Sequence, residues 1–191
     1  IHHHRFDDAN HWSKIFEDPT RDKWQKPNYV IKKLNIEKNF IIADIGSATG
    51  YFPIRLSKVV SQGRVWGIDV EPNLINYLNN RVKKEKITNL FSILGTFKDP
   101  LIPEPVDLVI MVNTYHHITN RIKYLKTITP HLKSGGRIAI IDFKAGDLPI
   151  GPKKEMKISK NKIIQEFKSA NYKLSSEDVD LPYQFILIFK L

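Results

Sequence analysis

Short apolar runs that alternate with helical patterns constrain the fold of this chain most. Residues 40–43 form an apolar run, a glycine-containing turn follows, and residues 51–60 have a helical pattern. The same order recurs at residues 65–68 and 72–84. Parallel strands need a crossover between them, usually a helix, whereas antiparallel strands need only a tight turn. The alternation therefore predicts an α/β fold with a mostly parallel sheet.

The pattern continues to about residue 170 and then changes. Two β-rich runs, residues 172–181 and 183–191, flank Pro182 with no room for a crossover helix, so we expect an antiparallel hairpin. Ser159 is a suitable N-cap for the last helix, because its hydroxyl oxygen can accept a hydrogen bond from a free N–H of the first turn. The intervening segments are predicted as strands at residues 91–94, 106–112 and 137–142 and as helices at residues 120–129 and 159–170.

The residues before the first strand carry three large aromatic anchors, Trp12, Phe16 and Trp24. Large apolar side chains of this kind favour a segment that folds back onto the main domain rather than a disordered tail. We therefore expect an amino-terminal helical cap at residues 1–38 and one main domain at residues 39–191.

The composition excludes several classes of site. The chain has no cysteine, which rules out disulfides, thiolate metal ligands and thiol nucleophiles. Its longest apolar runs, such as residues 108–112 and 185–189, are far below the roughly 20 residues that a membrane-spanning helix needs. We expect a soluble, cytoplasmic protein without a membrane partner. Because the chain starts at Ile1 rather than methionine, a cleaved amino-terminal signal stays an open alternative.

The charge is strongly basic but scattered. Thirty Lys and Arg against twenty Asp and Glu give a formal net charge of +10 and a sequence pI near 9.6. Local clusters, such as residues 81–86 and 153–168, coincide with predicted helix faces and ends, where polar residues belong in any case. This favours solvated helix faces over a nucleic-acid-binding stripe. Nucleic acid is a disfavoured partner, and the oligomeric state is not defined by the sequence.

The turn after the first strand, residues 44–50, has the features of a ligand-binding loop. Backbone N–H groups and a helix start face outward there, and glycines let a ligand approach the backbone. A dinucleotide site prefers glycine at the second position of its motif, where this chain has Ala48. Asp44 would also repel a pyrophosphate, whereas it suits a ligand with an ammonium group. Both features argue against a dinucleotide.

Asp69 ends the second strand, where a carboxylate can accept hydrogen bonds from two ribose hydroxyls. The alternative is a plain turn, with glycines that relieve strain and an aspartate that merely ends a strand. Asp44, Gly46, Gly50 and Asp69 together, each where a strand is predicted to end, favour a nucleoside site over that alternative.

Four segments then resemble the class I S-adenosylmethionine-dependent methyltransferases. The glycine loop "ADIGSATGYF" and the acidic second-strand motif "VWGIDVEPNLI" match the first half of the family pattern. "VDLVIMVNTYHHI" is similar to its fourth-strand motif, and "LKSGGRIAIIDF" to the turn and strand that follow. The amino-terminal segments "RFDDANHW" and "FEDPTRDKWQKPNYVI" resemble the cap of a small bacterial uncharacterised subgroup.

The resemblance implies a Rossmann-like, doubly wound, mostly parallel seven-stranded sheet with an antiparallel carboxyl-terminal hairpin strand and an amino-terminal helical cap. It also implies S-adenosylmethionine as the methyl donor. In this family pattern Thr96 stands where many members have an acidic residue that accepts from the adenine amine; Asp99 is an alternative acceptor. The residues implied for the donor are Asp44, Gly46, Ser47 and Gly50 at the methionine end, Asp69 at the ribose, Val70, Thr96 and Phe97 at the adenine, and Asn113 beneath the sulfonium.

Tyr115 and His116 are the candidate catalytic residues, because they follow the fourth strand at the edge where the methyl group is expected. His116 is the candidate general base, since histidine titrates near neutral pH. The alternative is structural: one residue of the pair His116 and His117 caps the next helix and the other packs on the sheet. Trp24 and Gln25, with Tyr29, either line a lid over the site or form the core of the cap.

The leading hypothesis is methyl transfer to a small-molecule oxygen, nitrogen or carbon nucleophile. Residues 113–116 replace the tetrapeptide by which many nucleic-acid amino-methyltransferases hold a flipped base. Two alternatives stay open: a nucleic-acid or protein methyltransferase, suggested by the basic charge, and a nucleoside-binding module without catalysis. No metal is assigned, because consecutive histidines at a terminus bind metals adventitiously or belong to a tag. The histidines concerned are His2, His3, His4 and His11.

Overall fold

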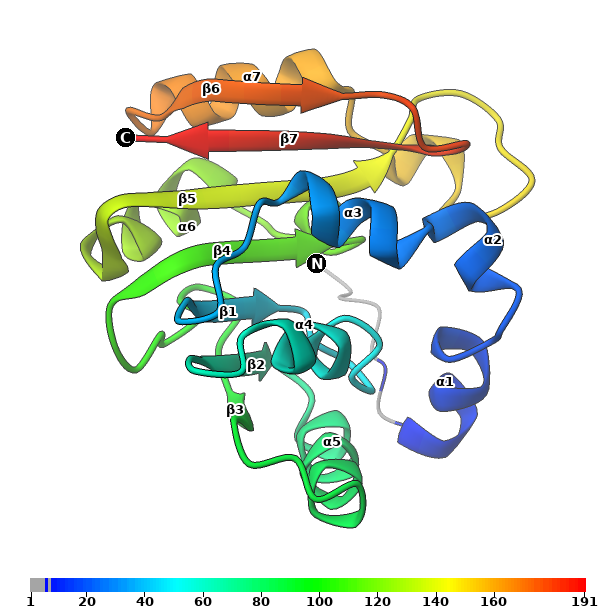
Figure 1. Ribbon diagram of the computed structural model, residues 1–191. Helices are drawn as coiled ribbons and strands as arrows, with labels where there is room; N and C mark the ends of the chain where they lie inside the picture. The colour runs from blue at the N-terminus through cyan, green and yellow to red at the C-terminus, as the bar shows by residue number, and fades with distance from the viewer. Residues whose placement is uncertain (1–5, 7) are drawn as a thin grey trace.

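The computed structural model describes Phe6 and residues 8–191, and within them the strands form one sheet of seven (Figure 1). The strands are β1 (Ile41–Ile45), β2 (Arg64–Asp69), β3 (Leu90–Leu94), β4 (Val106–Val112), β5 (Leu132–Phe143), β6 (Lys173–Asp178) and β7 (Gln184–Lys190). Their order across the sheet is β3-β2-β1-β4-β5-β7-β6. The first five strands pair in parallel, whereas β7 is antiparallel to both β5 and β6. The predicted mostly parallel α/β sheet with an antiparallel carboxyl-terminal hairpin is confirmed.

Helices follow β1, β2 and β4, whereas a loop joins β3 to β4, and the helices cover both faces of the sheet (Figure 1). The helix expected at residues 51–60 is shorter, because Tyr51 and Phe52 complete the turn and Pro53 opens the helix. The predicted N-cap is confirmed: the Ser159 hydroxyl oxygen accepts from the backbone N–H of Lys162 at 3.3 Å. The α-helices are α1 (Ala9–Phe16), α2 (Arg21–Gln25), α3 (Pro27–Lys33), α4 (Pro53–Val59), α5 (Pro72–Lys84), α6 (Arg121–Ile128) and α7 (Lys160–Ser169), and the short 3-10 helices are η1 (Tyr115–His117), η2 (Thr129–His131) and η3 (Lys154–Met156).

Strand β5 is longer than the run that predicts it. It begins at Leu132 instead of residue 137 and passes through Gly135, whose positive φ of 75° marks an irregularity in the strand. The register against β4 shifts at the same place, between Val106 and Leu108. Apolar alternation does not reveal such a segment, because its side chains are small or polar.

The core has two layers, one on each face of the sheet. Leu108 and Ile110 of β4 pack in a cluster with α3, α4 and α5, whereas Val109 and Met111 pack in a second cluster with α6 and α7. This alternation follows from the two-residue period of a strand. Both faces of β4 are buried, which is why its sequence is one continuous apolar run.

The strand order places β1 and β4 side by side at the point where the chain changes direction. The chain runs outward from β1 to β2 and β3, then returns to the other side of β1 to form β4 and β5. In open α/β sheets the loops that leave such neighbouring strands diverge and form a ligand crevice at their carboxyl ends. Helices α1 and α2 lie beyond this edge of the sheet (Figure 1). Within the described residues, no helix combines the length and the apolar character needed to cross a membrane.

Candidate active site

The loop after β1 is tied to the end of β2. The backbone N–H groups of Gly46 and Ser47 both donate to the carbonyl oxygen of Ile68, at 2.7 and 3.1 Å. Gly46 has a φ of 81°, and a Cβ atom there would lie 2.1 Å from the Thr114 hydroxyl oxygen. Only glycine fits this position, because the loop after β4 passes so close. The glycine loop is therefore held against the strands on both sides of it.

Asp69 lies at the end of β2 and fastens the same loop. Its Oδ2 accepts from the backbone N–H of Ala48 at 2.9 Å, and its Oδ1 accepts from Val70 and Glu71 at 2.8 and 3.1 Å. A carboxylate has about four acceptor positions, so these three bonds leave one on Oδ2. Asp69 can thus accept from one ligand hydroxyl as the structure stands, and the two-hydroxyl contact expected from the sequence requires Oδ1 to give up a backbone bond.

Asp44 is the most deeply buried acid of the site. It ends β1 between Gly67 of β2 and Ile110 of β4, and only 2% of its surface is exposed. Burial, together with the nearby Asp69 charge, raises its pKa to about 8, and Arg21 opposes the shift. A buried carboxyl with this pKa is poised to ionise when a cation arrives.

Ser47 provides an unsatisfied polar atom beside these two acids. Its hydroxyl oxygen is buried and, like that of Ser92 on β3, has no hydrogen-bond partner among the described residues. Buried hydroxyls in native proteins nearly always have a partner, so the Ser47 hydroxyl, on the loop next to Asp44, is available to a bound group. A ligand with an ammonium group and a neighbouring polar group fits the pair.

His116 is oriented by an acid that sequence reasoning did not identify. Its Nδ1 lies 2.9 and 3.0 Å from the two carboxylate oxygens of Asp142, and both side chains are almost fully buried. An ionised carboxylate only accepts, so Nδ1 carries the proton and Nε2 is left as the free acceptor of the neutral ring. Asp142 also accepts from the backbone N–H of Phe143 at 2.8 Å. Like Asp44 and Asp69, it stands at the end of an apolar strand, and that position was the signal in the sequence.

Asn113 belongs to a ring of three amides between the cap and the sheet. Its Nδ2 donates to Gln25 Oε1 at 3.4 Å, Gln25 donates to Gln184, and Gln184 donates back to Asn113 Oδ1. Gln25 and Gln184 are fully buried. Asn113 has a positive φ of 57°, which turns the chain at the end of β4. Gln184 was not predicted; its signal is a polar residue at the start of an otherwise apolar strand.

Known proteins share this arrangement. A family model described as a methyltransferase domain matches residues 36–180. The "Uncharacterized methyltransferase YdaC" of Bacillus subtilis is 28% identical over 170 residues, which cover 89% of this chain and 87% of that protein. A crystal structure of an S-adenosylmethionine-dependent methyltransferase from Aquifex aeolicus is 26% identical, has a TM-score of 0.88, and covers 95% of this chain and 97% of its own. A fibrillarin-like rRNA/tRNA 2'-O-methyltransferase of Methanosarcina barkeri is 27% identical, over 87% of this chain and 74% of that protein.

The chain belongs to the methyltransferase domain family. It is an enzyme that uses S-adenosylmethionine, which supplies an electrophilic methyl group on a sulfonium. The residues present fit this cofactor, because the ammonium of its amino-acid end suits buried Asp44 and its ribose suits Asp69.

Other predicted residues of the methyltransferase lie less directly at the site. Thr96 is exposed, and its hydroxyl is engaged within its own loop: it donates to the carbonyl oxygen of Asp99 and accepts from the Asp99 N–H, both at 2.9 Å. The Asp99 carboxylate itself accepts from the backbone N–H of Leu101 at 2.8 Å. Phe97 is exposed on the same loop, and Val70 is half-buried. The Thr96 hydroxyl is therefore not free to accept from an adenine without rearrangement, whereas the Asp99 carboxylate has further acceptor positions.

Tyr115 faces the other side of the sheet from the glycine loop. Its side chain is fully buried against Phe167, and its hydroxyl donates to Glu166 at 2.9 Å. Glu166 is also held by Arg121 at 2.8 and 2.9 Å. Burial and the Glu166 charge raise the pKa of the Tyr115 hydroxyl. The structure therefore separates Tyr115 from His116, and we leave it out of the catalytic machinery.

Of the four amino-terminal histidines, His2, His3 and His4 lie outside the described residues. His11 is exposed and packs against Trp12. Among the residues that are described, no group of three or more His, Asp or Glu side chains is arranged to hold a metal ion.

The pKa of Asp44 predicts a pH-dependent stability. The native carboxyl keeps its proton up to about pH 8, whereas its ordinary pKa is 3.8. Between these values the native state binds more protons than the unfolded state, so the free energy of unfolding falls as pH rises. Asp44→Asn mimics the protonated carboxyl and removes this contribution. As pH rises from 5 to 8, the midpoint of thermal unfolding of the variant should therefore increase relative to that of the wild type. Parallel pH profiles of the two proteins would contradict the assignment.

Proposed function

We propose that this methyltransferase transfers a methyl group to a small-molecule acceptor with an oxygen, nitrogen or carbon nucleophile, at the carboxyl ends of β1 and β4. The observation that carries the proposal is that buried Asp44, the orphan hydroxyl of Ser47 and the loop-bound Asp69 gather at neighbouring strand ends, where Glu17, at the end of α1, accepts from Thr49 of the glycine loop. A site that an amino-terminal segment closes over in this way suits a small acceptor better than a large polymer.

The donor is held by residues of four elements. Asp44 binds the ammonium group, because it is the buried acid nearest the loop. The Ser47 hydroxyl forms a hydrogen bond with the amino-acid end of the donor, which lies along the glycine backbone. Asp69 binds the ribose through the open position on Oδ2. The remaining donor contacts in this proposal are Gly46 and Gly50 in the loop, Val70, Thr96 and Phe97 around the adenine, and Asn113 beneath the sulfonium.

His116 is the general base of the proposed reaction. The acceptor atom forms a bond to the methyl carbon while the carbon–sulfur bond breaks and its electron pair stays on sulfur, giving S-adenosylhomocysteine. The proton of the acceptor passes to Nε2 of His116, and the Asp142 carboxylate stabilises the imidazolium that results. The contact at 2.9 Å supports this division of roles, because Asp142 holds the ring in one orientation.

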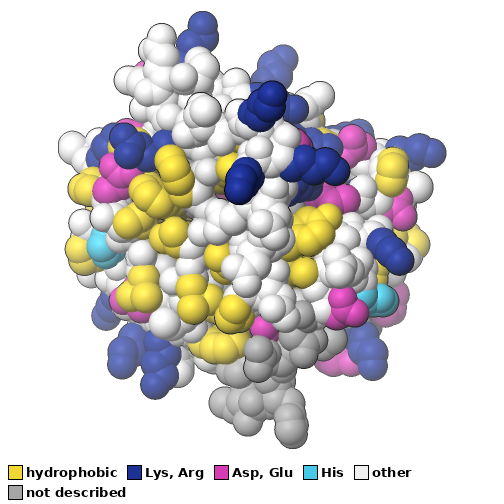
Figure 2. Space-filling model, turned by 90° about the horizontal axis from the view of Figure 1, so that it is seen from below, with side chains coloured by type: hydrophobic (Ala, Val, Ile, Leu, Met, Phe, Trp, Pro, Cys, Tyr) yellow, Lys and Arg dark blue, Asp and Glu magenta, His cyan; other side chains and the backbone are white. Residues whose placement is uncertain are grey.

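The charge distribution favours the small acceptor over nucleic acid. Lys and Arg side chains on the face in Figure 2 lie at separate places, interspersed with acidic side chains, instead of along one stripe. A nucleic-acid acceptor stays the second candidate, because the net charge is +10 and one relative is named as an rRNA/tRNA methyltransferase. Phosphate contacts make binding steeply salt-dependent.

The first test compares acceptors. We expect the protein to convert S-adenosylmethionine to S-adenosylhomocysteine with at least one member of a panel of small hydroxyl, amine and carbon nucleophiles. Binding of tRNA, measured by filter retention at 50 mM and 200 mM salt, serves as the competing measurement. Methylation of tRNA with steep salt dependence and no small-molecule turnover would replace the proposed acceptor class.

A second test addresses the ribose contact. Asp69→Ala removes an acceptor and should weaken the binding of S-adenosylhomocysteine by about 1–3 kcal/mol. Asp107→Ala is a matched control, because Asp107, like Asp69, accepts a backbone N–H, that of Ile41 at 2.7 Å; it also forms an ion pair with Lys133 at 2.8 Å. It lies at the amino end of β4, away from the crevice. Calorimetry should show the loss in the first variant alone; equal affinities in both would refute the ribose assignment.

A third test addresses the base. His116→Ala should leave donor affinity intact and slow turnover on the order of 10²-fold or more, with loss of the pH-rate limb that reports the histidine. Asp142→Asn should move that limb, because the stabilised imidazolium loses its charged partner. His117→Ala is the control, since its ring lies 4.1 Å from that of His116 while the Asp142 carboxylate is bonded to the His116 ring. Unchanged turnover in the first variant would assign His116 to structure.

A further inference from the structure

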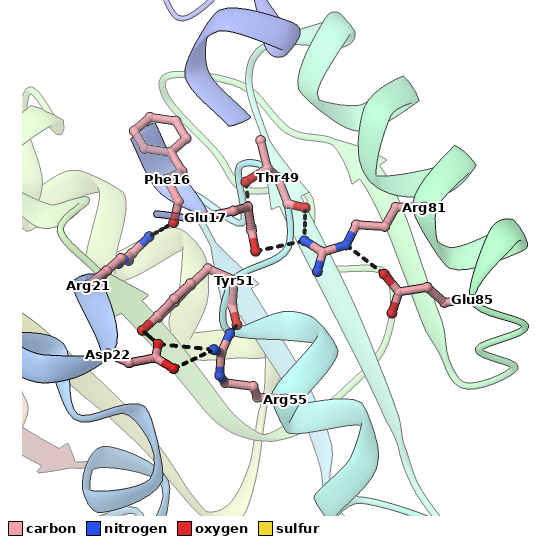
Figure 3. A network of polar contacts seen from close by, with 9 residues as sticks. All are labelled: Phe16, Glu17, Arg21, Asp22, Thr49, Tyr51, Arg55, Arg81 and Glu85. Carbon is pink, nitrogen blue, oxygen red and sulfur yellow. Dashed lines mark hydrogen bonds and ion pairs between the residues drawn. The ribbon is translucent and has the colours of Figure 1, made fainter. Parts of the chain in front are cut away.

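Three arginines lie where the cap meets the glycine loop and its following helices, and two of them have a carboxylate partner (Figure 3). Arg81 pairs with Glu17 at 2.9 Å and with Glu85 at 2.8 Å. Arg55 pairs with Asp22 at 3.1 Å. For Arg21, no carboxylate of the described residues lies within ion-pairing distance. Its charge is therefore the unbalanced one at this junction.

Arg21 reaches both sides of the crevice. Its guanidinium carbon lies 3.8 Å from the centre of the Tyr51 ring, and Tyr51 directly follows the glycine loop. Its Nε donates to Gln25 Oε1 at 3.0 Å, the same oxygen that accepts from Asn113 at the end of β4. The guanidinium thus spans the gap between the loops after β1 and β4, which is where the amino-acid end of the donor is placed in the proposed function.

The guanidinium still has free hydrogen-bonding capacity. One N–H is used by Gln25, and Nη1 donates to the carbonyl oxygen of Phe16 at 2.8 Å. A guanidinium has five N–H donors in a planar fork that matches a carboxylate. Arg55 lies 4.0 Å from the same Tyr51 ring, so the two cations must occupy opposite faces of it. The Tyr51 ring therefore orients the guanidinium plane of Arg21 from one side. The remaining N–H donors of Arg21 are left for another partner.

We propose that Arg21 is the receptor for the donor's carboxylate, so that the cap, rather than the glycine loop alone, recognises the amino-acid end of S-adenosylmethionine. This inference rests on the proposed function. Asp44 takes the ammonium and Arg21 takes the carboxylate, so the two charges of the amino acid are matched across the crevice. Without a cation, the carboxylate would enter a region that already holds Asp44 and Glu17, which would repel it. Burial lowers the pKa of Arg21 to about 10, and an incoming anion would relieve that cost.

The experiment uses two ligands that differ in one group. S-adenosylhomocysteine has the carboxylate, and its decarboxylated analogue, S-adenosyl-3-thiopropylamine, keeps the nucleoside, the sulfur and the ammonium. The full chain and its Arg21→Gln variant are titrated with both by calorimetry. Wild type should prefer S-adenosylhomocysteine, and the variant should lose that preference by about tenfold or more, as for a charge-assisted hydrogen bond. Arg21→Lys, which keeps the charge but not the fork, should retain part of it.

Arg55→Gln is the matched control, because Arg55 stacks on the same ring but is already paired with Asp22. It should keep the full preference. If Arg21→Gln and Arg21→Lys weaken both ligands equally, Arg21 only holds the cap in place and the inference is overturned, while the donor site stands. If wild-type protein binds neither ligand, the proposed function fails and takes the inference with it.

Discussion

The bond pattern that ties the glycine loop to the end of β2 is the constraint on which the rest of the site depends. Two backbone N–H groups converge on the carbonyl oxygen of Ile68, and a third donates to Asp69. These bonds fix where the loop turns, and Gly46 allows Thr114 to close on it from the side of β4. With the loop fixed, Asp44 and Asp69 occupy neighbouring strand ends, and the crevice between β1 and β4 has a defined floor.

Buried charged side chains determine which ligand this site can bind. Asp44 has a pKa raised to about 8, chiefly by burial, although the Arg21 charge opposes the shift. Arg21 bears the opposite charge above the loop, with its pKa lowered by the same desolvation. Such unsatisfied groups cost stability in the free protein, and a zwitterionic ligand offsets that cost when it binds. His116 and Asp142 form a hydrogen-bonded dyad, to which the proposed function assigns the proton transfer.

The sequence predicts the strands and loops that build this site better than the contacts between residues far apart in the chain. Alternating apolar runs are enough to predict the parallel sheet and the final hairpin, and the acids at strand ends are visible as Asp44 and Asp69. The contact between His116 and Asp142 joins residues 26 positions apart, and the ring that includes Gln25 and Gln184 joins residues 159 apart. Local patterns carry no information on such pairs. The opposite directions of neighbouring side chains in the 3-10 turn of Tyr115, and the hydrogen bonds that the Thr96 hydroxyl makes within its own loop, likewise depend on local geometry that the sequence does not reveal.

A crystal structure of the protein with S-adenosylhomocysteine tests the central claim most directly. The account predicts the ribose within hydrogen-bond distance of Asp69 Oδ2 and the amino group against Asp44, with the glycine loop unmoved. A nucleoside bound outside the gap between β1 and β4, or an amino-acid end that points away from Asp44, would contradict it.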